Sequence, residues 1–193
     1  MSHRFLVSAR LYSILLRIDE ECSEEVREAG CPCGGRLHTS NYPRKPRGGP
    51  AELGPEQRER LSFCCDRDGC RKRATPPSVR FLGQRVYMAA VVTLVAALMH
   101  GTTAARIRKL ATLVGDVSDR TLSRWRSWWQ EIFPTTDFWR EHGARLAPAL
   151  ATDRLPASLI ERFSGNDIQA RLVATLRFLS PLTTAWRPQA QKK

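Results

Sequence analysis

The chain has 193 residues, of which 26% are charged and 42% hydrophobic, a composition that fits a folded protein better than a disordered one. The length suits one medium domain or two small ones. Its 31 Lys and Arg against 19 Asp and Glu give a formal net charge of +12, so we expect a polyanionic partner, nucleic acid above all. The six cysteines are too few and too uneven for a secreted disulfide framework. No signal peptide is visible, and the longest uncharged apolar run, Val86–Met99, is shorter than the roughly 20 residues of a membrane span. We therefore expect a cytoplasmic protein with reduced thiols and no membrane partner.

Residues 9–29 predict an amphipathic helix that Gly30 can end. The other face of this helix is charged. Cys22 lies on the apolar face, so we expect it to be a buried structural thiol and not a metal ligand. The apolar face consists of Leu11, Leu15, Ile18, Cys22 and Val26.

Five of the six cysteines fall between residues 31 and 70. The first group is Cys31 and Cys33, with one residue between them, and the second is Cys64, Cys65 and Cys70. Because successive strand residues point to opposite faces, Cys64 and Cys65 cannot both easily face one metal ion. Cys65 shares its parity with Phe63, on the apolar side, so we expect Cys65 to join the cluster.

Glycines in or after each cysteine pair predict tight turns that bring backbone N–H groups toward sulfur; they are Gly34, Gly35 and Gly69. Tetrahedral Zn²⁺ takes four soft donors and prefers thiolates in structural sites. The predicted ligands of one structural Zn²⁺ are Cys31, Cys33, Cys65 and Cys70. Such a closed site leaves no position for catalysis. Ordinary free thiols are the alternative, and His38 is an alternative fourth ligand.

From Arg85 onward the composition becomes helical. Residues 86–99 are apolar on nearly all sides, which predicts a helix buried in a small core. A second helix is predicted between Gly101 and Gly115, and a third over 119–132. Beyond Pro134 the pattern predicts short helices at about 137–147, 156–163 and 167–179, and then a disordered tail.

At 100° per residue, the helix over 119–132 gathers an apolar seam of Leu122, Trp125, Trp129 and Ile132. The opposite face centres on Arg120 and Ser127. Arginine can grip guanine O6 and N7 with two bonds, and serine can contact phosphates or bases. The residues of this helix predicted to contact DNA are Arg120, Thr121, Ser123, Arg124, Arg126 and Ser127. A solvated basic face is the alternative.

The stretch 41–55 contains four prolines and is expected to be a loop or an extended arm without regular structure. Its cations Arg44, Lys45 and Arg47 suit an arm that follows a nucleic-acid backbone or lies in a minor groove. A solvated loop is the alternative.

The run LATLVGDVSDRTLSRWRSWW, residues 110–129, resembles a bacterial helix-turn-helix, whose usual pattern is A-x3-G-V-S-x2-T-[VL]-S-R. The matching residues are Ala111, Gly115, Val117, Ser118, Thr121, Leu122, Ser123 and Arg124. Asp116 is inserted after the glycine, so the turn is one residue longer. Together with the cysteine segment, residues 31–130 resemble the N-terminal DNA-binding part of bacterial insertion-sequence transposases.

This resemblance implies recognition of the terminal repeats of a mobile element by this part of the protein. In such transposases a catalytic domain of the RNase H type follows, and it carries three metal-binding carboxylates. Only 59 residues follow Pro134, and their acidic residues are scattered over predicted helices. We therefore expect no catalytic domain and no enzyme activity.

The predicted fold is mainly α with a small β zinc ribbon, and with a helix-turn-helix bundle in the second half. The expected segments are an N-terminal helix (1–30), a zinc-ribbon-like segment with a basic loop (31–83), a helix-turn-helix domain (84–133), short C-terminal helices (134–180) and a disordered tail (181–193). The expected function is zinc-stabilised, sequence-specific binding of duplex DNA, as a transposition accessory factor or a transposase-derived regulator. The alternatives are a zinc-ribbon protein that binds RNA or ribosomes, and an adaptor for a separate transposase or nuclease. The oligomeric state is left open.

Overall fold

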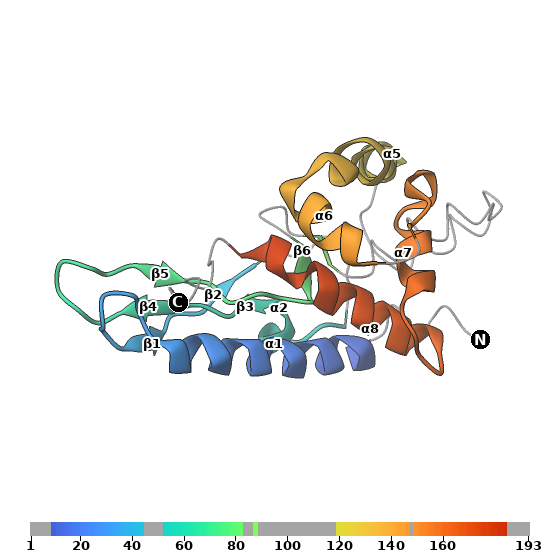
Figure 1. Ribbon diagram of the computed structural model, residues 1–193. Helices are drawn as coiled ribbons and strands as arrows, with labels where there is room; N and C mark the ends of the chain where they lie inside the picture. Colours follow the sequence, from blue (N-terminus) through green and yellow to red (C-terminus); the bar gives the residue numbers. More distant parts are fainter. Residues whose placement is uncertain (1–8, 45–51, 83–86, 89–118, 147–148, 185–193) are drawn as a thin grey trace.

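The structure is a computed structural model that describes residues 9–44, 52–82, 87–88, 119–146 and 149–184 (Figure 1). It is helix-rich and carries a small antiparallel sheet, as the mainly α prediction requires. The first helix of the predicted helix-turn-helix and its turn lie outside the described residues. So does most of the apolar run that begins at Val86.

Helix α1 (Ala9–Ala29) has the bounds that the sequence predicted. Leu11, Leu15 and Val26 are buried on its apolar face, and the helix ends at Gly30, whose φ of +68° is a conformation that favours glycine. Cys22 is half-buried against the core, and burial, with the charge of Asp19 next in importance, raises the pKa of its thiol. Cys22 is therefore a packing residue, as expected.

The sheet lies at one end of α1 and has the strand order β1-β4-β5 (Figure 1). The strands are β1 (Leu37–Thr39), β4 (Phe63–Cys65) and β5 (Arg73–Ala74), and both pairings are antiparallel. In register, Leu37 lies opposite Cys65, and His38 lies opposite Cys64. The buried face of β1 and β4 packs against Val26 of α1. We call residues 31–44 and 58–74 the cysteine ribbon.

The proline-rich stretch that was expected to be irregular contains short regular elements at both ends. Strand β2 (Tyr42–Pro43) pairs with β3 (Glu59–Arg60), and Pro55 begins helix α2 (Pro55–Arg58). Proline is compatible with both places, because an edge strand and the first helical turn each tolerate a missing N–H. Residues 45–51, with Lys45 and Arg47, lie outside the described residues.

A second correction concerns the helix predicted from Val86. Tyr87–Met88 form strand β7, which pairs with β6 (Phe81–Leu82) in the register Phe81 opposite Met88. An apolar run of this kind does not distinguish a strand from a buried helix by periodicity, so the pairing partner decided the conformation.

The second half is helical. Its described elements are α5 (Asp119–Ser127), a π-helical turn η2 (Trp128–Ile132), η3 (Phe133–Thr135), α6 (Asp137–His142), η4 (Gly143–Arg145), η5 (Thr152–Arg154), α7 (Ala157–Arg162), α8 (Ile168–Leu179) and η6 (Ser180–Thr183). The three C-terminal helices predicted from the sequence are confirmed as α6, α7 and α8. Thr136 and Asp167 cap α6 and α8 through their side-chain oxygens.

Segments distant in the sequence share the main hydrophobic core. It joins Leu11 and Leu15 of α1 to Trp129, and to Leu172 and Leu176 of α8. A smaller cluster, in the cysteine ribbon, contains Val26, Cys31, Leu37, Phe63 and Cys65. Because α1 contributes to both clusters, it links the ribbon to the helical part.

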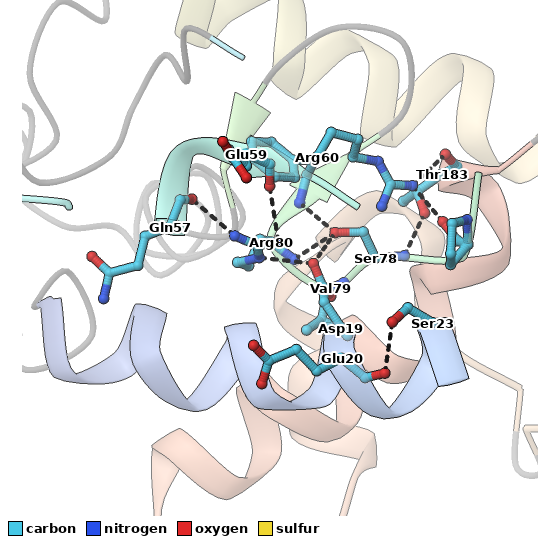
Figure 2. A network of polar contacts seen from close by, with 12 residues as sticks. Asp19, Glu20, Ser23, Gln57, Glu59, Arg60, Ser78, Val79, Arg80 and Thr183 are labelled. Atoms are coloured by element: carbon cyan, nitrogen blue, oxygen red, sulfur yellow. Dashed lines mark hydrogen bonds and ion pairs between the residues drawn. The ribbon is translucent and has the colours of Figure 1, made fainter. Parts of the chain in front are cut away.

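A buried ion pair ties α1 to residues 78–80, which follow the ribbon, and through Arg80 to residues 56–59 (Figure 2). The carboxylate of Asp19 accepts hydrogen bonds from the Ser78 hydroxyl (2.6 Å), the Val79 N–H (2.7 Å) and the Arg80 Nε–H (2.8 Å). Both charged side chains are fully buried. Arg80 also donates to three backbone carbonyls, those of Glu56, Gln57 and Glu59. The buried charges are therefore paired and hydrogen-bonded, as burial demands.

Arg60 extends this network to the C-terminal end of the described chain. Its guanidinium is buried and donates to the carbonyls of Pro76 (2.5 Å) and Thr183 (3.2 Å), while the Thr183 hydroxyl accepts the N–H of Ser78 (2.8 Å). The disordered tail predicted from residue 181 is thus placed too early, because Thr183 is held in η6 by these bonds. Residues 185–193 lie outside the described residues.

Candidate metal centre and basic helix

Two short loops present the cysteines at one end of the ribbon. In the first, the N–H of Gly34 bonds to the carbonyl of Cys31 (2.8 Å), and Gly34 has a φ of +80°. In the second, the N–H of Cys70 bonds to the carbonyl of Arg67 (3.0 Å), and Gly69 also has a φ of +80°. Each loop therefore turns at a glycine in a conformation that other residues rarely adopt.

Polar contacts hold the two loops together. The Asp66 carboxylate accepts the N–H of Arg36 (2.9 Å), and the N–H of Asp66 bonds to the carbonyl of Arg36 (3.0 Å). The guanidinium of Arg67 donates to the carbonyl of Cys33. The relative position of the two loops is thus supported by backbone and side-chain hydrogen bonds and does not depend on sulfur alone.

The sulfur atoms of Cys31, Cys33, Cys65 and Cys70 all lie within 4.8 Å of one another. The distance from the Cys33 Sγ is 3.4 Å to the Cys31 Sγ and 3.5 Å to the Cys65 Sγ, and that from Cys31 to Cys70 is 3.7 Å. A disulfide would need about 2.05 Å, so the four are free thiols in a cluster. These four residues could hold a metal ion, and they are the four that the sequence predicted.

The remaining candidates in this region lie apart from the cluster. Cys64 is half-exposed and donates to backbone carbonyls of Cys65 and Arg71. His38 is exposed, with its Nε2 3.4 Å from a carboxylate oxygen of Asp66. The alternation of strand residues therefore decided between Cys64 and Cys65 as expected.

Gly35 has a different role from its neighbour Gly34. A Cβ on Gly35 would lie 2.5 Å from the Cys65 Sγ and 3.0 Å from the Cβ of Arg67. A Cβ on Gly69 would meet nothing within 4 Å. Glycine at position 35 is thus required by the close approach of the first loop to the Cys65 sulfur.

The four thiols also influence one another's ionisation. The backbone N–H of Gly35, followed by bonds from the neighbouring thiols, lowers the pKa of Cys33 to about 6. For Cys65, the N–H of Arg67 lowers the pKa, but partial desolvation and bonds with the other thiols outweigh it and raise the pKa to about 12. The loops therefore favour a first thiolate at Cys33, and thiolates are the form that ligates metals.

Helix α5 carries most of the residues predicted to contact DNA. Arg120, Ser123, Arg124 and Arg126 are exposed, and Ser127 is half-exposed. The side chain of Thr121, like that of Leu122, lies outside the described parts of the structure. Arg44 is half-exposed beside β2. Lys45 and Arg47 lie in the segment that is not described.

The π-helical turn η2, which continues α5, has an aromatic buried side. Trp129 is 1% exposed, and its ring lies 4.9 Å from that of Trp128 and 4.7 Å from that of Phe133, between centroids. Ile132, which was predicted to complete the seam, is instead 52% exposed. The cause is the π-helical turn at 128–132, in which the Phe133 N–H bonds to the Trp128 carbonyl; this wider turn rotates Ile132 away from the core and turns Phe133 inward.

Sequence reasoning missed the network around Asp19, Arg60 and Arg80. The partly visible signal was Asp19, a charged residue next to Ile18 on the apolar face of α1. Nothing in the local pattern indicated a partner 61 residues away.

Comparison with family models, curated proteins and solved structures gives no match to this chain. Among the described residues, none of the helices combines the length and the apolar character that crossing a membrane requires.

Proposed function

We propose that this protein is a zinc-stabilised, sequence-reading DNA-binding protein, which acts as a transposition accessory factor or a transposase-derived regulator. The observation that carries the proposal is the exposed row of arginine and serine side chains on α5, backed by buried Trp129, in a chain that also presents four clustered thiols.

The spacing of the thiols favours zinc. A tetrahedron with Zn–S bonds of about 2.3 Å has sulfur atoms about 3.8 Å apart along its edges. The three sulfur distances of 3.4, 3.5 and 3.7 Å are close to that value. Zn²⁺ is also the ion for which four thiolates are a common structural donor set, and its role here would be to stabilise the ribbon.

The α5 surface favours DNA over a merely solvated face. Arg120 lies in the first turn of the helix, which is the part that usually meets base edges in a major groove, and Ser123 and Arg124 follow one turn later. Trp125 of α5, with Trp128 and Trp129 of the η2 turn that follows it, packs on the main core, so the exposed side of α5 is held in a fixed orientation. A rigid presentation of this kind suits direct readout by arginine.

The proposal is tested by selecting binding sites from random duplex DNA with the zinc-loaded protein. Arg124→Ala should lose most of the preference for the selected site, because a bidentate contact to one base contributes about 1–3 kcal/mol of discrimination. Arg171→Ala, an exposed arginine on α8, is the matched control and should keep the preference. A chain that binds neither random nor selected duplexes at low salt would refute the proposal.

A second candidate, RNA or ribosome binding through the cysteine ribbon, is favoured by the exposed cations around the second cysteine loop. They are Arg67, Arg71, Lys72 and Arg73. It predicts tighter binding to RNA than to duplex DNA, and no effect of Arg124→Ala. The two candidates therefore give opposite results for the same variant.

A further inference from the structure

The cysteine ribbon has one covered face and one open face. Leu37, Phe63 and Cys65 point to the covered face, where they pack with Val26 of α1. The residues that alternate with them, His38, Cys64 and Arg73, lie opposite one another in the register of the three strands and so share the other face. His38 and Arg73 are exposed and Cys64 is half-exposed, which leaves this face open.

Arg73 is fixed on this open face and does not extend freely into solvent. Its Nη1 donates to the carbonyl of Ser40 (2.9 Å) and to the hydroxyl of Ser62 (3.0 Å). The side chain therefore crosses β4 to reach the chain between β1 and β2. Two donor bonds hold its guanidinium in place before any ligand arrives, which reduces the entropy lost on binding.

An aromatic ring, Tyr42, and a second arginine, Arg44, lie beside Arg73. The guanidinium carbon of Arg73 lies 5.3 Å from the centre of the Tyr42 ring, and that of Arg44 lies 5.2 Å from it. The N–H of Arg44 bonds to the carbonyl of Arg58 (2.9 Å), so its backbone is also fixed. Both cations are thus placed around one half-exposed ring.

We propose that Arg73, Tyr42 and Arg44 form a second nucleic-acid contact, which binds the phosphodiester backbone without reading sequence. Guanidinium groups bind phosphate oxygens, and rings beside them accept the stacking of a base or sugar. Arg73 on the open face of the three-stranded sheet and Tyr42 on the neighbouring strand β2 together offer a cation and a ring, which suits this ligand chemistry. This inference rests on the proposed function, nucleic-acid binding. The residues that carry it are separate from those of α5.

The test measures binding of the full-length, zinc-loaded protein to three labelled probes of the same base sequence, namely duplex DNA, single-stranded DNA and RNA, across a salt titration. Arg73→Ala should weaken binding and reduce the magnitude of the salt slope by about 0.9 on the duplex or about 0.7 on a single strand. Arg73→Lys keeps the cation and should keep the slope. Arg171→Ala is the control for a lost surface charge.

Tyr42→Ala and Tyr42→Phe separate the ring from the hydroxyl. If a base stacks on the Tyr42 ring, Tyr42→Ala should weaken single-strand binding about 5- to 150-fold and duplex binding much less. Tyr42→Phe keeps the ring and should leave the binding of both probes unchanged. The probe with the larger loss identifies the source of the backbone. Zinc content and circular dichroism of each variant exclude a folding defect.

The inference is overturned if Arg73→Ala, Arg44→Ala and Tyr42→Ala all behave like Arg171→Ala on the three probes. In that case the proposal that α5 reads the DNA sequence still holds, provided that Arg124→Ala loses its preference for the selected site. Conversely, an effect of Arg73→Ala with none of Arg124→Ala refutes sequence reading by α5 and supports the ribbon contact.

Discussion

The paired substitutions Cys65→Ser and Cys64→Ser test the metal centre most directly, because the two residues are adjacent and of the same type. The Sγ of Cys65 lies 3.5 Å from that of Cys33, inside the cluster. The Sγ of Cys64 bonds only to backbone carbonyls among the contacts of the described residues. We expect Cys65→Ser to lose zinc and Cys64→Ser to retain one zinc per chain.

Cys65→Ser should lower stability strongly, because the cysteine ribbon has only a small hydrophobic core besides the metal centre. Apart from cysteines, the buried residues of its small core are Val26, Leu37 and Phe63, and full burial of three such side chains contributes roughly 5–9 kcal/mol. A structural zinc contributes on the order of 10 kcal/mol. Loss of a residue that only hydrogen-bonds a metal ligand lowers metal affinity about 10–100-fold, so loss of a thiolate that binds the metal directly should lower it more. Cys65→Ser should therefore lower both metal affinity and the stability of the ribbon, and Cys64→Ser neither.

The assay is metal content by mass spectrometry, followed by Co²⁺ titration, in which visible d–d bands report tetrahedral thiolate coordination. Thermal unfolding is recorded with and without a chelator, and the wild type and Cys64→Ser should lose stability when chelated. The argument fails if Cys64→Ser loses zinc as completely as Cys65→Ser. It also fails if the wild type contains no zinc and takes up no Co²⁺.

Three further predictions follow from individual contacts. In a urea titration, Asp19→Asn should lower the free energy of unfolding by about 3–5 kcal/mol, because it leaves the buried charge of Arg80 unpaired. The control Glu21→Gln breaks an exposed ion pair with Arg177 of α8 and should lower the free energy of unfolding by less than about 1 kcal/mol. Gly35→Ala should reduce Co²⁺ affinity, because the added Cβ displaces the Cys65 sulfur. Gly69→Ala should lower the stability of the chain by roughly 1–2 kcal/mol, the cost of a left-handed residue, and keep the Co²⁺ affinity. Equal Co²⁺ affinities in the two variants would contradict the close approach of Gly35 to Cys65. Trp129→Ala should destabilise the chain by about 3–5 kcal/mol in thermal unfolding, and a loss under 1 kcal/mol would show that α5 is not anchored through this ring.

The four clustered cysteines could be predicted because the signals that select them within each half of the cluster are local. Two glycine-bearing turns and the alternation of a strand were enough to select Cys65 over Cys64. The bounds of α1 and of the three C-terminal helices were likewise set by helical periodicity, glycine and proline.

The errors fall where a contact with another strand, or a change of helix type, overrides the expected periodicity. Tyr87–Met88 form a strand because Phe81–Leu82 lie beside them. Ile132 is exposed because one π-helical turn shifts the register that a uniform 100° step assumes. In each case the local sequence is compatible with the conformation seen but does not demand it.

The sequence by itself determined which cysteines can face a metal ion, where most helices begin and end, and which side of the helix over 119–132 is apolar, since each depends on spacing within a few residues. The meeting of Cys33 with Cys65, 32 residues away, is a tertiary contact. Only the tertiary structure decided that Asp19 meets Arg80, that Thr183 is held by Arg60, and that Arg73 crosses β4 to reach Tyr42. These pairs bring together chain segments far apart in the sequence. Side-chain spacing cannot encode such meetings, because they depend on the path of the whole chain and on the burial that the path creates.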